Sequence, residues 1–83
     1  MSEVRRVSAD ELEARYKTKH GLLDFFDLMK TKIHEHFEDK GISWKTCPIG
    51  FLKLELLKHA KNEDWVDVAN FAFMLDDRQR NKK

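Results

Sequence analysis

Apolar residues recur at helical spacing through most of the chain. Leu23, Phe26, Met29, Ile33 and Phe37 follow one another three or four positions apart, as residues on one face of a helix do. Only one proline and three glycines punctuate the 83 residues, so long helices are the simplest interpretation. The pattern predicts an all-α fold built as a four-helix unit.

The first helix begins at a capping signal. Ser8 and Glu11 form a capping box, in which the serine hydroxyl accepts from the amide three residues on, so a helix is expected over 9–19. Gly21 is a plausible break after it, although 20–21 could also lie within one longer helix. The sequence leaves these two alternatives open.

The other predicted boundaries also coincide with capping or helix-breaking residues. Lys40 and Gly41 end a helix over 22–39, and Pro48 begins one over 49–59. A last helix starts at Asn62 or Glu63 and continues to about Arg78. The domain organisation is therefore one helical domain over 8–78, between a tail over 1–7 and a basic tail over 79–83.

The segment from Trp65 to Leu75 is apolar on almost every side, with Asp67 and Asn70 as its polar interruptions. A helix of this kind must be buried on nearly every side, and a buried carboxylate is costly unless it is paired or bound to a metal. Because a chain this small forms only a marginal core, we expect it to complete that core as a dimer or higher oligomer through residues 65–75.

Composition excludes several classes of protein. Sixteen Lys and Arg balance fifteen Asp and Glu, so the global charge does not favour nucleic acid, and the basic ends are expected to be solvated. No apolar run is long enough to span a membrane, and the N-terminus has no signal-peptide pattern. The single cysteine, Cys47, cannot form an internal disulfide, which fits a cytoplasmic protein.

Carboxylates gather around the turn between the last two predicted helices. Asp64, Asp67 and Asn70 follow at intervals of three, so they project from one side of the last helix. Helices joined by a tight turn pack antiparallel, which brings Glu55 level with Asp67. Converging carboxylate oxygens suit Mg²⁺ or Mn²⁺, ions that neutralise phosphate charge and activate water.

A simpler interpretation of the same carboxylates needs no metal. Glu63 and Asp64 can complement the positive end of the helix dipole, while Glu55 is solvated and pairs with His59 or Lys58. Asp67 is the residue that this alternative explains least well.

The predicted loop over 41–48 holds Trp44, close in sequence to Lys40. An exposed tryptophan beside lysines can stack on a base while a lysine pairs with a phosphate, or the tryptophan can cap the core. The four histidines show no partner at metal-ligand spacing and are expected to be surface residues. Cys47 likewise has no zinc-ligand or nucleophile pattern around it.

The sequence DVANFAFMLD, at residues 67–76, resembles the last conserved helix of phage-type, MazG-like nucleotide pyrophosphohydrolases. His36 and Phe37, leading to Lys40-Gly41 and then Trp44, also resemble this group. The resemblance covers about residues 22–76, which is most of the chain.

This resemblance implies an all-α, dimeric or tetrameric enzyme that cleaves nucleoside triphosphates to monophosphate and pyrophosphate with Mg²⁺. The acidic motif of the family is ExxE followed by ExxD. Glu55 matches the first glutamate, Asp64 takes the place of a later glutamate, and Asp67 matches the final aspartate. Lys58 stands where the second glutamate of ExxE belongs, and this departure removes one ligand.

The sequence therefore predicts a small MazG-like protein that binds a nucleotide through Mg²⁺ or Mn²⁺. Glu55 and Asp67 would be catalytic, Glu55, Asp64 and Asp67 would hold the metal, and substrate contacts would come from Lys40, Trp44, Lys58 and Asn70. The alternative is a non-catalytic interaction protein, such as a viral adaptor or inhibitor, with an oligomer interface made by Phe71, Phe73 and Met74.

Overall fold

The computed structural model describes residues 6–81, and helices account for most of them. The elements are α1 (Ala9–Lys40), the 3-10 turn η1 (Ser43–Lys45), α2 (Ile49–Lys61) and α3 (Trp65–Arg80). Residues 6–81 contain no strand, which confirms the all-α class. Parts of the predicted tails, residues 1–5 and 82–83, lie outside the described residues. Within the described range, no helix is both long and apolar enough to cross a membrane.

α1 takes the place of the two helices expected over 9–19 and 22–39. The Ser8 hydroxyl accepts a hydrogen bond from the Glu11 amide at 3.1 Å, as the capping box predicts. Gly21 does not break the helix, because a glycine in a helix interior costs only about 1 kcal/mol. The helix ends where predicted, at Gly41, whose φ of 61° lies in the region that favours glycine.

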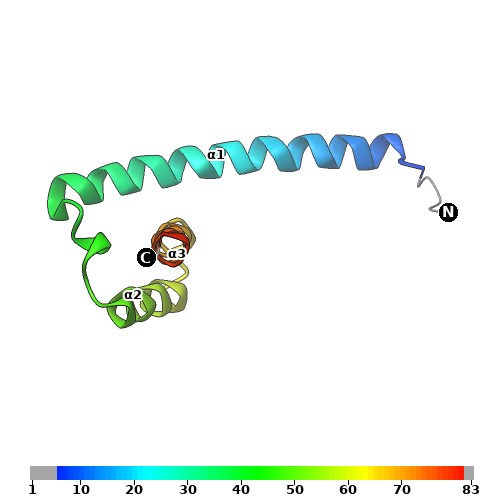
Figure 1. Cartoon of the computed structure of the whole chain (residues 1–83). Coiled ribbons are helices and arrows are strands. Elements are labelled where there is room, and N and C mark those ends of the chain that lie inside the picture. The colour runs from blue at the N-terminus through cyan, green and yellow to red at the C-terminus, as the bar shows by residue number, and fades with distance from the viewer. Residues whose placement is uncertain (1–5, 82–83) are drawn as a thin grey trace.

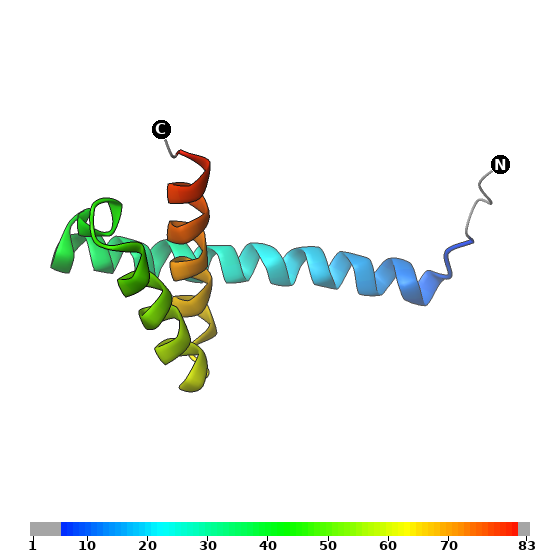
Figure 2. The same cartoon turned by 60° about the horizontal axis from the view of Figure 1, so that its bottom comes forward.

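α2 and α3 form a hairpin, and α3 packs against the C-terminal half of α1 (Figure 1). α3 crosses α1 steeply, and α2 lies beside α3 (Figure 2). In both views the N-terminal half of α1 extends away from the other helices. A helix of 32 residues is about 48 Å long. α1 therefore spans the longest dimension of the molecule, which is 48 Å.

The core lies where η1, α2 and α3 meet. Its buried apolar residues are Trp44, Leu52 and Met74. The partly buried side chains packed against them are those of Ile33, Cys47, Phe71 and Leu75. This core is small, and α1 contributes no buried residue to it.

Two side chains of α3 hold the other elements in place. Asn70 is 6% exposed, and its Nδ2 donates to the main-chain oxygen of Met29 in α1 at 3.1 Å. Arg78 Nη1 donates to the main-chain oxygens of Trp44, at 3.3 Å, and of Cys47. These contacts fix α3 against α1 and the 44–47 segment against the end of α3.

The expectation that residues 65–75 are buried on nearly every side is not met within one chain. Only Asn70 and Met74 of this helix are buried, whereas Trp65 is 58% and Phe73 is 41% exposed. Of the three residues suggested for an oligomer interface, Met74 is instead a core residue, because this side of α3 packs on Leu52 and Trp44.

Candidate functional site

Three carboxylates from the α2–α3 hairpin surround the imidazole of His59. Its Nε2 lies 3.7 Å from Glu55 Oε2, and its Nδ1 lies 3.4 Å from Asp64 Oδ2 and 3.6 Å from Asp67 Oδ2. Glu55 precedes His59 by one turn of α2, whereas the aspartates stand at the beginning of α3. The short turn between the two helices therefore brings all four side chains together. We call them the His59 cluster.

The structure brings the three predicted metal ligands into this cluster but places His59 between them. Glu55 faces one ring nitrogen and the two aspartates face the other. His59, Asp64 and Asp67 each offer a ligand atom, and these atoms lie within 4.8 Å of one another. Glu55 is not part of this closer group and lies by the other ring nitrogen, Nε2.

His59 is the residue that the sequence interpretation missed. The prediction that it is a surface histidine without partners is wrong, since its side chain is only 25% exposed and contacts three carboxylates. The available signal was its position four residues after Glu55, which places the two on one face of α2. The alternative in which Glu55 pairs with His59 used that spacing, and the structure contains this pair.

Asp64 and Asp67 are both placed by the beginning of α3. Asp64 is the N-cap residue, yet its side chain makes no capping hydrogen bond, and its Oδ2 lies beside His59 instead. Asp67 lies in the first turn, where the positive end of the helix dipole stabilises an anion. Lys32 of α1 approaches Asp67, with 4.0 Å between Nζ and Oδ2. The helix dipole is therefore not the sole electrostatic partner of either aspartate, since both lie beside His59.

A hollow of about 130 Å³ adjoins the His59 cluster. At roughly 30 Å³ per water it has room for about four waters, so it admits a part of a nucleotide. Glu55 belongs to both the hollow and the cluster, and Phe71 lines the hollow while stacking on His59, with ring centroids 5.2 Å apart. The remaining lining residues are His36, Lys40, Ser43, Trp44, Cys47, Phe51 and Leu52.

Two residues that line this hollow carry buried polar atoms without a hydrogen-bond partner among residues 6–81. These atoms are Nε1 of Trp44 and Nε2 of His36. Buried polar groups in proteins are nearly always hydrogen-bonded, and an unpaired one costs about 1–3 kcal/mol. A bound polar molecule that reached either atom would recover that cost, which makes this hollow a candidate binding site.

The structure changes the interpretation of two predicted substrate contacts. Trp44 is only 5% exposed, so its ring belongs to the core, which confirms the alternative in which it caps the core. Asn70 is also buried, and its amide joins α3 to α1 rather than lining the hollow. Trp44 is therefore not placed as an exposed base-stacking group, and Asn70 is not placed as a substrate contact in the hollow.

The two predicted lysine contacts lie at different places. Lys40, the last residue of α1, is exposed and lines the hollow. Lys58 is exposed on α2, one turn beyond Glu55, and is not among the residues that line the hollow. Of the two lysines, only Lys40 therefore lines the hollow.

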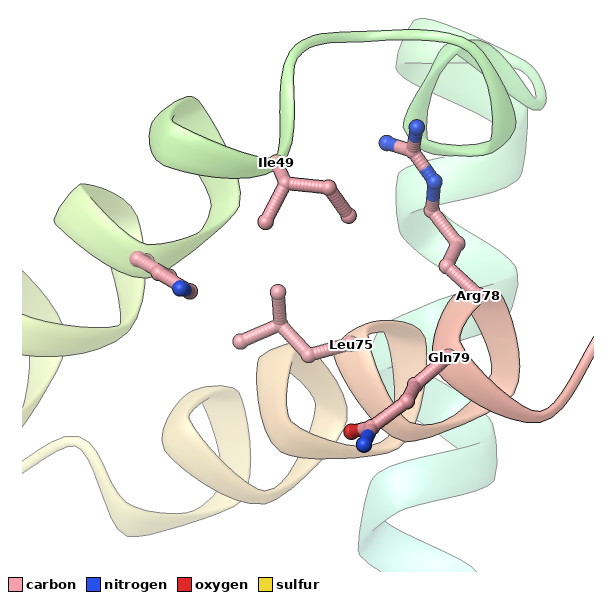
Figure 3. Close-up of a pocket in the computed structure, with 5 residues that line it drawn as sticks. Ile49, Leu75, Arg78 and Gln79 are labelled. Carbon is pink, nitrogen blue, oxygen red and sulfur yellow. The ribbon is translucent and has the colours of Figure 1, made fainter. Parts of the chain in front are cut away.

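A larger, open groove of about 700 Å³ lies between the beginning of α2 and the end of α3. Figure 3 shows Ile49 and Leu75 facing each other across it, while Arg78 extends toward the loop that precedes α2. None of the predicted site residues lines this groove, and its Arg78 is already bonded to loop carbonyls. The chemistry of the chain is therefore concentrated at the His59 cluster and the adjoining hollow.

Comparison of the chain with models of protein families, with curated proteins and with solved structures finds no match. The resemblance to MazG-like enzymes therefore rests on the residues of the sequence, chiefly those at 67–76.

Proposed function

We propose that this protein binds a nucleotide through a divalent metal ion held by the His59 cluster. The observation that carries the proposal is the convergence of His59, Asp64 and Asp67 beside a hollow with unpaired polar atoms. Two carboxylates suit Mg²⁺ or Mn²⁺, and the imidazole nitrogen shifts the preference toward the transition metal, Mn²⁺. The contact between Lys32 and Asp67 is long and partly exposed, so it opposes metal binding only weakly.

In this arrangement Glu55 contacts the His59 ring nitrogen that does not face the metal and so orients the ring. A histidine that binds a metal through one ring nitrogen usually presents the other to a carboxylate, which orients the ring and raises its basicity. Glu55 lies on the Nε2 side, whereas both aspartates lie on the Nδ1 side. We therefore propose Glu55 as a positioning residue, in place of the direct ligand that the sequence suggested.

The hollow provides a place for a part of the nucleotide. Phe51 and Phe71 give it apolar walls, and Lys40 offers a point charge for a phosphate. A bound divalent ion would neutralise phosphate charge and activate water. In the reaction that the resemblance implies, water is added across the bond between the α- and β-phosphates, and the nucleoside monophosphate and pyrophosphate leave.

A second candidate function is that of a non-catalytic interaction protein. Lys58 favours it, because this exposed cation stands one turn from Glu55, where the family motif has a carboxylate. The apolar side chains exposed on α3 also favour it, since Trp65 and Phe73 can contact another chain. Self-association through residues 65–75 is part of both proposals.

The proposal is tested by product analysis with the pure protein and a panel of nucleoside and deoxynucleoside triphosphates. We expect monophosphate and pyrophosphate with Mn²⁺ or Mg²⁺ and none with a chelator. Asp67→Asn should lower the rate by at least roughly tenfold, because it weakens one of three ligands. The matched control is Asp76→Asn, an exposed aspartate of the same helix that pairs with Arg80 and should leave the rate unchanged.

Full metal-dependent activity in Asp67→Asn would remove the His59 cluster from the mechanism. Melting curves with and without the metal distinguish the two candidate functions. A metal that binds only the native state raises the melting temperature by mass action. A folded protein with no turnover and no metal-induced rise would contradict the nucleotide proposal and leave the interaction protein.

A further inference from the structure

A regular seam of apolar residues runs along α1. Positions alternate four and three residues apart from 12 to 37, which is the a/d pattern of a heptad repeat. Two of the eight positions are Lys19 and Lys30. The six apolar positions are Leu12, Tyr16, Leu23, Phe26, Ile33 and Phe37, and we call this set the α1 seam.

Most of the α1 seam is uncovered in the single chain. Leu12 is 56%, Tyr16 is 63% and Leu23 is 60% exposed. Phe26, at 52%, and Phe37, at 40%, continue the exposed stripe. Leu12, Tyr16 and Leu23 lie on a different side of the helix from the partly buried Phe25, Met29 and His36. Phe26 stands at the edge between the two sides, because it lines a hollow with Met29 of α1 and Phe73 of α3. Ile33 is the seam residue that also packs on the core.

The two lysines do not prevent a helix from packing on this seam. Lys30 Nζ lies 5.2 Å from the centre of the Phe26 ring and 3.6 Å from Asp27, so its charge is held along the helix surface. A lysine stem can cover apolar surface while its ammonium stays in water. Polar residues at single a or d positions lower the stability of a helix pair and help to fix its register.

The accessible surface area of the chain is much larger than that expected for a compact monomer of its mass. Its accessible area is 7217 Å², whereas a compact protein of 9.9 kDa exposes roughly 5200 Å². Its radius of gyration is 17.3 Å, against about 12 Å for a compact chain of this length. The excess, roughly 2000 Å², falls in the range that each partner of an obligate dimer buries, about 1000–2500 Å².

We infer that the α1 seam pairs with the α1 seam of a second copy of this chain. A heptad seam is covered best by another helix of the same period, and a two-fold pairing of identical seams closes into a dimer. Along α1, eight acidic and six basic residues are interspersed, so no strong charge selects an oppositely charged partner. The pairing also supports the N-terminal half of α1, which extends away from the other helices (Figure 2).

This inference does not depend on nucleotide binding. It gives the α1 seam, in place of the surface proposed at residues 65–75, as the contact that makes the dimer, and it concerns the protein without nucleotide or metal. Its test therefore uses the full chain without nucleotide or metal, so that its failure and the failure of the proposed function are distinguishable.

Sedimentation over a concentration series tests the seam. We expect the wild-type chain to reach twice its 9.9 kDa mass. Leu23→Glu should weaken the dimer at least about tenfold, because pairing would bury an unpaired carboxylate. The matched control is Leu28→Glu: Leu28 is 56% exposed and lies on the opposite side of α1, so this variant should dimerise as the wild type does.

A third variant, Trp65→Glu, separates the two surfaces. A wild-type chain that stays monomeric throughout would overturn the inference. Equal weakening by Leu23→Glu and Leu28→Glu would do so as well, as would a loss of the dimer in Trp65→Glu alone. Cooperative thermal unfolding of each variant shows that the monomer is folded, and a lower far-UV helical signal in Leu23→Glu would support the role of pairing in ordering α1.

Discussion

At the scale of single residues, Asn70 shows how a contact decides the role of a polar side chain. Its place three residues after Asp67 suggested a contact to the substrate. Its amide instead donates to Met29, a helical residue whose carbonyl has a second lone pair for this purpose. The structure therefore assigns Asn70 to the junction of α1 and α3.

We expect Asn70→Ala to lower the free energy of unfolding by about 1–3 kcal/mol, since a buried hydrogen bond between two helices is lost. Urea denaturation measures the change. Asn81→Ala is the control: the side-chain amide of this exposed C-cap residue bonds, among residues 6–81, to Asp77 one turn earlier, and its loss should cost less than about 0.5 kcal/mol. Equal losses in the two variants would show that the bond to Met29 contributes nothing to stability.

His59 is the opposite case to Asn70. The sequence gives it no functional role, yet its side chain lies among the three carboxylates of the candidate site. The sequence predicts the carboxylates around it, because acidic residues on either side of a tight turn between two antiparallel helices can converge. Two of its three carboxylate contacts, those to Asp64 and Asp67, join α2 to α3, and the angle between two helices fixes them. No spacing within one helix predicts that angle.

At the scale of elements, two glycines of similar sequence context have opposite effects on α1. Gly21 lies within the helix, and an added Cβ there would meet nothing within 4 Å. Gly41 ends the helix with φ 61° and ψ −139°, a conformation that residues with a Cβ adopt only under strain.

The expected results for the two alanine substitutions differ in sign. Gly21→Ala should raise the free energy of unfolding by about 0.5–1 kcal/mol, because alanine loses less backbone entropy in a helix. Gly41→Ala should lower it by about 1 kcal/mol or more. Urea denaturation of both variants, monitored by far-UV circular dichroism, measures these changes. Destabilisation by Gly21→Ala would mean that α1 bends or breaks at residue 21, as the four-helix alternative requires.

At the scale of the whole molecule, the small core and the extended α1 make the folded state depend on association. Only Trp44, Leu52 and Met74 are buried apolar residues among those described. If the α1 seam pairs as inferred, unfolding and dissociation are coupled, and the melting temperature depends on protein concentration.

Calorimetry over a hundredfold range of concentration measures this dependence. We expect the melting temperature of the wild type to rise with concentration and that of Leu23→Glu to stay nearly constant, because a monomer has no association step to couple. A wild-type melting temperature that is the same at all concentrations would contradict an obligate dimer, and Leu28→Glu serves again as the matched control.

The sequence by itself determined the fold class, most helix ends and the neighbourhood of the acidic residues. These follow from local physics: apolar spacing, the Ser8 cap, the glycine at 41 and the short turn between α2 and α3. Tertiary structure decided the continuity of α1 at Gly21, the burial of Trp44, the partner of Asn70 and the place of His59 among the carboxylates. Each of these depends on which helix faces lie against each other, because packing between distant segments selects among local conformations of similar energy.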